Sequence, residues 1–295
     1  MCGIAGILHL KGIDPEPVAR KMLLALQQRG RDATGMGAIV DGEFIVAKLP
    51  KQASEFIKSD PYKHFWSKHP KPPIILHTRA ATSGSPKNNE NNHPLLSKKG
   101  LILTHNGIIT NSKDLTKTLK LDVDGECDSE VVLRLIEQLF ETSYPKAIAE
   151  SVELTSGSWA CSLLTKLGYV YLWRNSMPIV VGYVPKIEAL VYASTKQIIN
   201  AGFGKTKEYL GFFRNLHTPK IIFQELEDEL IRIKGQKIEK FKLPEPKKVV
   251  WVGQGKQYDF YSQFDDEVIE DLEREYDTSR IITPKTNWSD LKGGK

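Results

Sequence analysis

The sequence predicts an α+β fold of four layers (αββα), in which two antiparallel sheets lie face to face and helices flank them on both sides. Patterns typical of strands and of helices are interleaved along the chain, which suits such a sandwich. Two hairpins support antiparallel pairing: one spans 37–49 and turns at Asp41-Gly42, and the other spans 229–243 and turns at 234–237.

Hydrophobic periodicity places the remaining elements in chain order. The segment 18–28 has the pattern of a short amphipathic helix, 129–141 carries apolar residues at helical spacing, and 148–154 predicts a further helix. Apolar runs at 73–76 and 101–104 predict buried strands. Four more strands are expected at 159–165, 169–174, 179–184 and 189–194.

Composition limits the class of protein. The chain has 295 residues, 40% of them apolar and 26% charged, enough for one large domain or two ordinary ones. No apolar stretch approaches the ~20 residues that span a bilayer, and the apolar run before Lys11 is too short for a signal peptide. Three cysteines do not form a disulfide framework. We therefore expect a cytoplasmic protein, with Cys161 in the core.

Cys2 is the first candidate for chemistry. Removal of Met1 would leave a thiol and a free α-amine on one residue, which supplies a nucleophile together with a base that titrates near ~7.7–8.0. The following run GIAGIL would hold that terminus in a buried strand, whereas ordinary termini fray. A chance cysteine on a short strand is the alternative, and Cys2 alone does not decide between them.

Five further motifs follow Cys2-Gly3 in a fixed order: RGRDATG at 29–35, HTRAAT at 77–82, NHP at 92–94, HNG at 105–107 and CDSE at 127–130. Together they resemble the glutaminase domain of class II glutamine amidotransferases, the N-terminal-nucleophile (Ntn) hydrolases found in glucosamine-6-phosphate synthase and amidophosphoribosyltransferase. Five motifs in one order carry far more information than any one of them. The resemblance covers about 2–243 and implies the Ntn-hydrolase sandwich.

Asn106-Gly107 is suited to stabilise an oxyanion. Amide hydrolysis passes through a tetrahedral oxyanion, and a side-chain amide beside a glycine N–H offers two donors, each contributing ~2.7–4 kcal/mol. The competing interpretation is a hairpin turn, for which Asn-Gly is a common signal. The strand-like run before this dipeptide and the resemblance favour the catalytic role.

Arg79 and Asp128 suit the two charged groups of a free amino acid. Arginine binds a carboxylate through two parallel hydrogen bonds, and Asp128 can accept from an ammonium. The alternatives are a surface arginine in a salt bridge, and an aspartate that caps the helix beginning beside it. Both uses of Asp128 are compatible, because a cap can lie at the mouth of a site.

The resemblance assigns the remaining roles. It implies that Thr82 and Gly107 contact glutamine and that Arg29 orders the site around Cys2. Ala80 stands where the sugar-phosphate synthases commonly have Trp, and Ser83 where they commonly have His, which puts that family's ammonia channel in doubt. His77, His93 and His105 occupy three separate segments without close paired spacing, so we expect hydrogen-bonding roles and no metal. No organic cofactor is expected.

The polar segment 83–92 has no apolar periodicity and reads as a mobile surface loop. Directly after the HTRAAT motif, it could close over a small substrate as a lid. An inert connection is the alternative.

The chain is expected to divide into an amidotransferase domain at 1–243 and a C-terminal extension at 244–295. The extension carries 11 acidic and 8 basic residues, a net of −3, and subtracting this from the total of +5 leaves +8 on the rest. Its acidic segment 265–277 has Val268, Ile269, Leu272 and Tyr276 at helical spacing, so it could dock on a partner or pack on its own domain. Basic residues within 232–248 alternate through the hairpin, as on a solvated strand face, and nucleic-acid binding is not expected.

The sequence therefore predicts a subunit that hydrolyses L-glutamine through Cys2 and passes ammonia to a separate synthase or acceptor-binding protein, or works in a homo-oligomer. Two alternatives stay open. One is a self-contained amidohydrolase acting on another amide, and the other is a catalytically silent module that senses glutamine.

Overall fold

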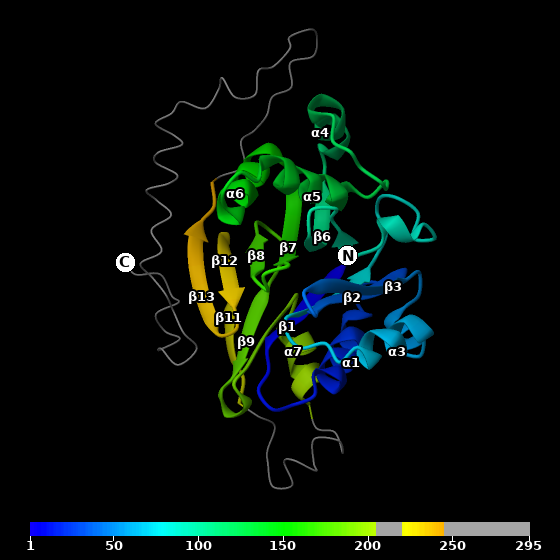
Figure 1. Ribbon diagram of the computed structural model, residues 1–295, viewed down its shortest axis with the longest axis vertical. Coiled ribbons are helices and arrows are strands. Elements are labelled where there is room, and N and C mark those ends of the chain that lie inside the picture. The colour runs from blue at the N-terminus through cyan, green and yellow to red at the C-terminus, as the bar shows by residue number, and fades with distance from the viewer. Residues whose placement is uncertain (205–219, 245–295) are drawn as a thin grey trace.

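The computed structural model describes residues 1–204 and 220–244, which form two antiparallel sheets (Figure 1). The first sheet has the strand order β11-β9-β10-β1-β4-β2-β3. Its strands are β1 (Gly3–His9), β2 (Ala33–Val40), β3 (Glu43–Leu49), β4 (Ile74–Arg79), β9 (Val180–Val184), β10 (Ala189–Ala193) and β11 (Ile222–Glu225). The second sheet has the order β13-β12-β8-β7-β6-β5. Its strands are β5 (Leu95–Leu96), β6 (Leu101–Ile109), β7 (Gly157–Thr165), β8 (Val170–Arg174), β12 (Glu229–Lys234) and β13 (Lys237–Lys242).

Helices cover the outer face of each sheet. The first sheet is covered by α1 (Pro15–Leu26), α2 (Ala53–Phe56), α3 (Asp60–Ser67) and α7 (Lys196–Phe203), and the second by α5 (Asp128–Leu139) and α6 (Tyr144–Leu154). The short α4 (Ser112–Leu119) packs on α5. Two 3-10 turns complete the described elements, η1 (Asn89–Asn91) and η2 (Pro185–Ile187). The predicted four-layer sandwich is confirmed.

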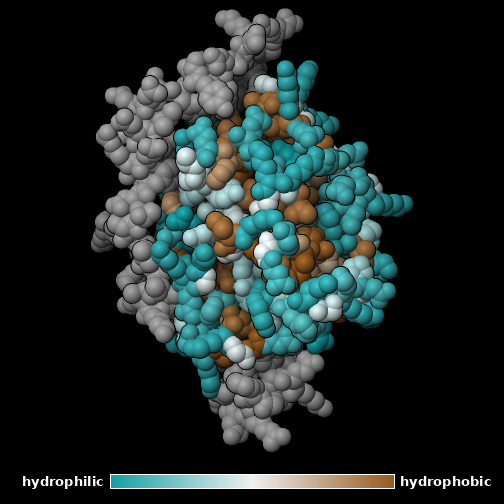
Figure 2. Space-filling view, in the orientation of Figure 1, coloured by the Kyte–Doolittle hydropathy of each residue, from teal (hydrophilic) through white to brown (hydrophobic). Residues whose placement is uncertain are grey.

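The core lies in three apolar layers, one between the sheets and one beneath each helical layer. Between the sheets, Ile4 and Ile75 of the first pack against Ile102 and Leu164 of the second, and all four are fully buried. Burial of this apolar surface is the main force holding the sheets together. Figure 2 shows a mostly hydrophilic face with apolar residues gathered toward its middle.

The predicted elements are present, and two of them, α6 and β6, differ in length from the prediction. The β2–β3 hairpin turns at Asp41 and Gly42, whose φ angles of 51° and 79° are those of a two-residue type I′ turn. Helix α6 begins earlier than expected, where Ser143 caps it by accepting from the Lys146 N–H. Strand β6 continues to Ile109, so Asn106-Gly107 lies within a strand and the hairpin-turn interpretation is wrong.

The basic hairpin β12–β13 neutralises much of its own charge. Arg232 pairs with Glu239, and Lys240 pairs with Glu229 at 2.9 Å. Glu239 is buried, so these pairs differ from the expected solvated strand face. Lys247, Lys248 and the acidic segment 265–277 lie outside the described residues. Within 1–204 and 220–244, no helix is long and apolar enough to cross a membrane.

Candidate active site

Cys2 lies beside the end of β4. The strand that follows it, β1, is paired between β10 and β4, and this fixes its direction. The Cys2 Sγ accepts from the Ala80 N–H at 3.4 Å and lies 3.5 Å from the Ala80 carbonyl oxygen. The Arg29 Nε donates to the Cys2 carbonyl at 3.0 Å. This bond joins Arg29 to the residue that it is predicted to order.

Two glycines of the motifs allow this close packing. A Cβ on Gly3 would lie 2.6 Å from Leu26, and one on Gly30 would lie 2.4 Å from the Arg79 carbonyl carbon. The first contact would displace the Leu26 side chain and the second would force two backbone segments apart, because real Cβ atoms do not approach so closely. The glycines after Cys2 and after Arg29 thus let three segments meet around the thiol.

The half-buried Cys2 lies in the field of both predicted recognition residues. Burial raises the pKa of its thiol, while the Ala80 hydrogen bond, the N-terminal charge and Arg79 lower that pKa and Asp128 raises it. The direction of the net shift is set by loss of solvation, which disfavours the thiolate. The charges of Arg79 and Asp128 both contribute to the pKa of this thiol, although the two residues lie 77 and 126 positions further along the chain.

Arg79 is 2% exposed and binds other parts of the protein. Its Nη1 donates to the Asn92 Oδ1 at 2.9 Å, and its Nη2 donates to the carbonyl oxygens of Ser83 and of Gly84, the latter at 2.9 Å. The surface salt-bridge interpretation is therefore wrong. A carboxylate could bind through the remaining N–H groups, or after the carbonyls release Nη2.

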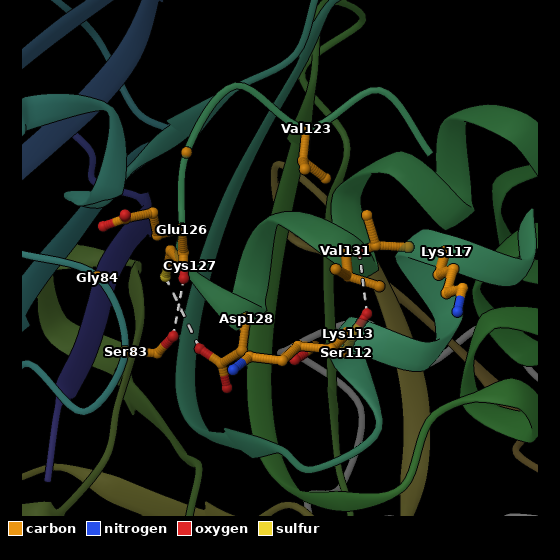
Figure 3. Close-up of a pocket in the computed structure, with 12 residues that line it drawn as sticks. Ser83, Gly84, Ser112, Lys113, Lys117, Val123, Glu126, Cys127, Asp128 and Val131 are labelled. Carbon is orange, nitrogen blue, oxygen red and sulfur yellow. Dashed lines mark hydrogen bonds between the residues drawn. The ribbon is translucent and has the colours of Figure 1, made fainter. Parts of the chain in front are cut away.

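Asp128 is the first residue of α5 and is 8% exposed. Its Oδ2 accepts from the Ile109 N–H at 2.7 Å, and the Cys127 Sγ lies 3.8 Å from its Oδ1. Cys127 occupies the cap position, so the prediction that Asp128 caps this helix is wrong. The carboxylate instead ties the helix start to the end of β6. It also lines a cleft of about 610 Å³ (Figure 3).

Asn106 is 1% exposed, and neither its Oδ1 nor its Nδ2 has a hydrogen-bond partner among the described residues. Its neighbour Gly107 has φ 149°, and a Cβ there would lie 1.9 Å from the Ser158 carbonyl oxygen. Only glycine fits this crossing of β6 and β7. A buried unpaired amide costs free energy, and such groups concentrate at functional sites.

Three buried histidines, predicted from separate segments, cluster behind these residues. The rings of His77 and His93 stack with centroids 4.3 Å apart, and the His77 Nε2 donates to the His105 carbonyl at 3.0 Å. The His105 Nδ1 is hydrogen-bonded to the Ser129 Oγ at 2.6 Å. Burial lowers the pKa of all three, that of His77 to about 3. The signal available in the sequence was one histidine in each of three motifs.

The segment 83–92 differs from the expected free surface loop. Thr82 is exposed, but Asn91 and Asn92 are fully buried. The Asn92 Nδ2 donates to the Pro86 carbonyl at 2.7 Å, and Lys48 donates to the Asn92 carbonyl at 2.9 Å. The end of the segment is therefore anchored, because its amide side chains find partners in the protein. Within the described residues, no group of three or more His, Cys, Asp or Glu could hold a metal ion.

Comparison with solved structures defines the class of fold. The glutamine phosphoribosylpyrophosphate amidotransferase of B. subtilis matches with a TM-score of 0.64 at 22% identity, covering 82% of this chain and 49% of the other. A structure described as the allosteric regulatory enzyme of purine biosynthesis matches with a TM-score of 0.65 over the same shares. The fold is the Ntn-hydrolase sandwich.

Sequence comparison shows which protein family part of the chain is similar to. Residues 77–201 match the glutamine amidotransferase domain family. The glutamine–fructose-6-phosphate aminotransferase (isomerizing) of Aquifex aeolicus is 34% identical over 171 residues, 56% of this chain and 27% of the relative. The Staphylococcus aureus protein of the same name is 33% identical over 190 residues, 62% of this chain and 30% of the relative. Residues 77–201 are thus similar to a glutamine amidotransferase domain, and the two alignments span less than a third of each of these relatives.

Proposed function

We propose that this chain hydrolyses L-glutamine to glutamate and ammonia, with Cys2 as the N-terminal nucleophile. The observation that carries the proposal is the contact of the Cys2 thiol with the backbone of Ala80, the residue after Arg79, in a fold whose buried Asn106 amide has no hydrogen-bond partner among the described residues. Nucleophile, charged recognition groups and oxyanion donor are the parts that this reaction requires.

The reaction needs a free α-amine on Cys2, so Met1 must be removed. The amine then accepts the thiol proton as Sγ attacks the carboxamide carbon. The C–N bond breaks, the leaving nitrogen takes up that proton, and ammonia departs from a γ-glutamyl thioester. Water then attacks the thioester, which releases glutamate and restores the thiol.

The remaining groups have separable tasks. The Asn106 Nδ2 and the Gly107 N–H stabilise the oxyanion, where preorganised donors act most strongly. Arg79 binds the α-carboxylate and Asp128 the α-ammonium. Thr82 contacts the substrate from the rim. Arg29 holds the carbonyl of Cys2 and so fixes the direction of the nucleophile.

We further propose that ammonia is used by a separate synthase or acceptor-binding partner, with the C-terminal extension 244–295 as the docking element. Ala80 stands where, by the resemblance, the sugar-phosphate synthases commonly have the Trp of their ammonia channel, so this proposal directs ammonia to a partner instead. Hydrolysis by the isolated chain should be slow and should rise when an acceptor-loaded partner binds. Deleting 244–295 should remove that stimulation and spare basal hydrolysis.

The test combines mass, turnover and labelling. Intact mass should show Met1 absent, ammonia and glutamate should form in equal amounts from L-glutamine, and a glutamine analogue with a diazoketone in place of the carboxamide should label Cys2. Retained Met1 on fully active protein would exclude the α-amine as base. Faster turnover of another amide would favour a self-contained amidohydrolase, and glutamine binding without turnover would favour a sensor.

A further inference from the structure

Two loops carry the proposed recognition residues. The arginine loop, 83–92, is bound by Arg79 through the carbonyl oxygens of Ser83 and Gly84 and through the Asn92 amide. The aspartate loop, 123–127, leads directly into Asp128. The two loops are 31 or more residues apart in the chain, so any coupling between them depends on tertiary contacts.

The side chain of Asn91 joins these loops. Asn91 is fully buried; its Oδ1 accepts from the Glu126 N–H at 2.7 Å, and its Nδ2 donates to the Ser85 carbonyl at 3.1 Å. One amide thus bonds to the backbone of both loops. A second link runs from the Ser83 Oγ to the Glu126 carbonyl at 2.7 Å (Figure 3).

Glycines on both sides hold the Asn91 amide in a narrow slot. A Cβ on Gly84, which has φ 69°, would lie 2.7 Å from the Asn91 Cγ, and a Cβ on Gly125 would lie 2.7 Å from the Asn91 Oδ1. Neither position tolerates a side chain at this separation. A shift of one loop would therefore displace the amide and, through it, the other loop.

The far side of the aspartate loop is equally fixed. The Glu130 carboxylate accepts from the Asp124 and Gly125 N–H groups, both at 2.8 Å. Arg134 binds this carboxylate at 2.7 Å and Asp124 at 2.7 Å. Because α5 carries Asp128, Glu130 and Arg134 together, a displaced aspartate loop would strain the start of the helix that positions Asp128.

We infer that Asn91 is a positioning residue that couples recognition of the α-carboxylate at Arg79 to recognition of the α-ammonium at Asp128, an inference that rests on the proposed function. A ligand carboxylate competes with the Ser83 and Gly84 carbonyls for Arg79 and so resets the arginine loop. Asn91 and Ser83 transmit that arrangement to the aspartate loop. Each end of a free amino acid then binds more tightly when the other end is bound.

The coupling is measurable with four amides that differ only at the two ends. L-Glutamine has both charged groups, glutaramate lacks the ammonium, 4-aminobutanamide lacks the carboxylate, and butanamide lacks both. The coupling factor is the product of kcat/KM for glutamine and butanamide, divided by the product for the other two. We expect a factor of about ten or more for the wild-type chain.

Asn91→Ala should lower the coupling factor to no more than the share of about threefold that the Ser83 link supplies, while butanamide turnover changes little. Asn88→Ala is the matched control, because the Asn88 Oδ1 accepts from the Glu90 N–H within the same loop at 3.1 Å and does not reach the aspartate loop. This control should keep the wild-type factor. Ser83→Ala removes only the second link and should lower the factor by about threefold, which provides a test if Asn91→Ala fails to fold.

Each outcome is decisive. An equal loss of kcat/KM for all four amides in Asn91→Ala would show a purely structural role and overturn the inference, as would a wild-type factor near one. An unchanged factor in folded Asn91→Ala would overturn it as well. If the wild-type chain releases no ammonia from glutamine under any condition, the proposed function fails, and the inference falls with it.

Discussion

Arg79 and Asn106 lie at two ends of the site and are buried to nearly the same degree, but they differ in how many hydrogen-bond partners the protein gives them. The Arg79 side chain, 2% exposed, has three protein acceptors, whereas the Asn106 amide, 1% exposed, has no partner among the described residues. The arginine end is completed by the protein and is ready to exchange partners. Under the proposed function, the unpaired Asn106 amide is free to bond to an atom of the ligand.

This difference has an energetic meaning. A buried polar group without a partner costs ~1–3 kcal/mol, while an intramolecular hydrogen bond contributes ~1 kcal/mol net. The unpaired Asn106 amide therefore lowers the stability of the folded state, and the hydrogen bonds of Arg79 raise it modestly. Groups that appear only in the transition state, such as an oxyanion, benefit most from the first arrangement.

The largest effect on activity is expected at Cys2, the proposed nucleophile. Cys2→Ala should abolish glutamine hydrolysis and leave the folded state intact, because the thiol contacts only the Ala80 backbone among the hydrogen bonds of the described residues. Cys161→Ala is the matched control. Cys161 is fully buried in the core, so its loss should lower stability and keep activity. Measured turnover in Cys2→Ala would remove the basis for the whole site.

The next effect tests the open end. Asn106→Ala should lower kcat by ~10²–10³-fold with little change in KM, and thermal stability should hold or rise because an unpaired buried amide is removed. Asn111→Ala is the control, since that amide is paired with the Leu154 carbonyl at 2.8 Å and the Ser156 N–H at 2.9 Å. It should lose stability and keep kcat. The same response from both variants would erase the distinction between open and satisfied amides.

A smaller effect is expected at the satisfied end. Arg79→Lys keeps the charge but loses the fork, so KM for glutamine should rise by about tenfold with a smaller change in kcat. Arg174→Lys is the control, because this guanidinium also bonds two carbonyls, of Leu226 at 2.9 Å and Asn175 at 3.0 Å. It should leave KM unchanged. An effect of Arg79→Lys on kcat alone would contradict a role in substrate binding.

The sequence could predict which residues form the candidate site, but not which hydrogen-bond partners each of them has. Motif order and strand patterns placed Cys2, Arg79 and Asp128 around one site, and hydrophobic periodicity located the strands that carry them. The pairing of Asp128 with the Ile109 N–H and the absence of a partner for Asn106 could not be predicted. Both depend on how two distant backbones meet, and local patterns carry no information on that geometry.

Asn91 and Gly107 illustrate the same limit. Asn91 lies in a polar stretch that is typical of a surface loop, yet it is fully buried because two backbones from different parts of the chain close on it. Gly107 is predicted to contact glutamine, and in the structure a Cβ at this position would collide with the Ser158 carbonyl. The chemistry of each side chain could be predicted from the sequence, but the groups that it contacts in the fold could not.

The smallest effect is expected at His77, which links the strand of Arg79 to the strand of Asn106. It is an effect on the stability of the folded state, and it appears only at acidic pH. His77 lies on β4 two residues before Arg79, and its Nε2–H bonds to the carbonyl of His105, next to Asn106. Burial lowers the pKa of His77 to about 3, below the ~6.5 of an unfolded chain. The folded state thus gains stability from a neutral His77 above about pH 6.5, and this is lost as the pH falls toward 3, at ~1.4 kcal/mol per pH unit.

Urea unfolding between pH 6 and pH 4 should therefore show a decline that His77→Gln makes shallower by ~1.4 kcal/mol per pH unit, because glutamine does not titrate and can still donate to the same carbonyl. The exposed His64 on α3 supplies the control, and His64→Gln should leave the slope unchanged. If the slope in His77→Gln equals that of the wild-type chain, the neutral histidine does not join the two ends of the site. A shallower slope with unchanged activity at pH 7 would instead show that the link stabilises the fold without entering the chemistry.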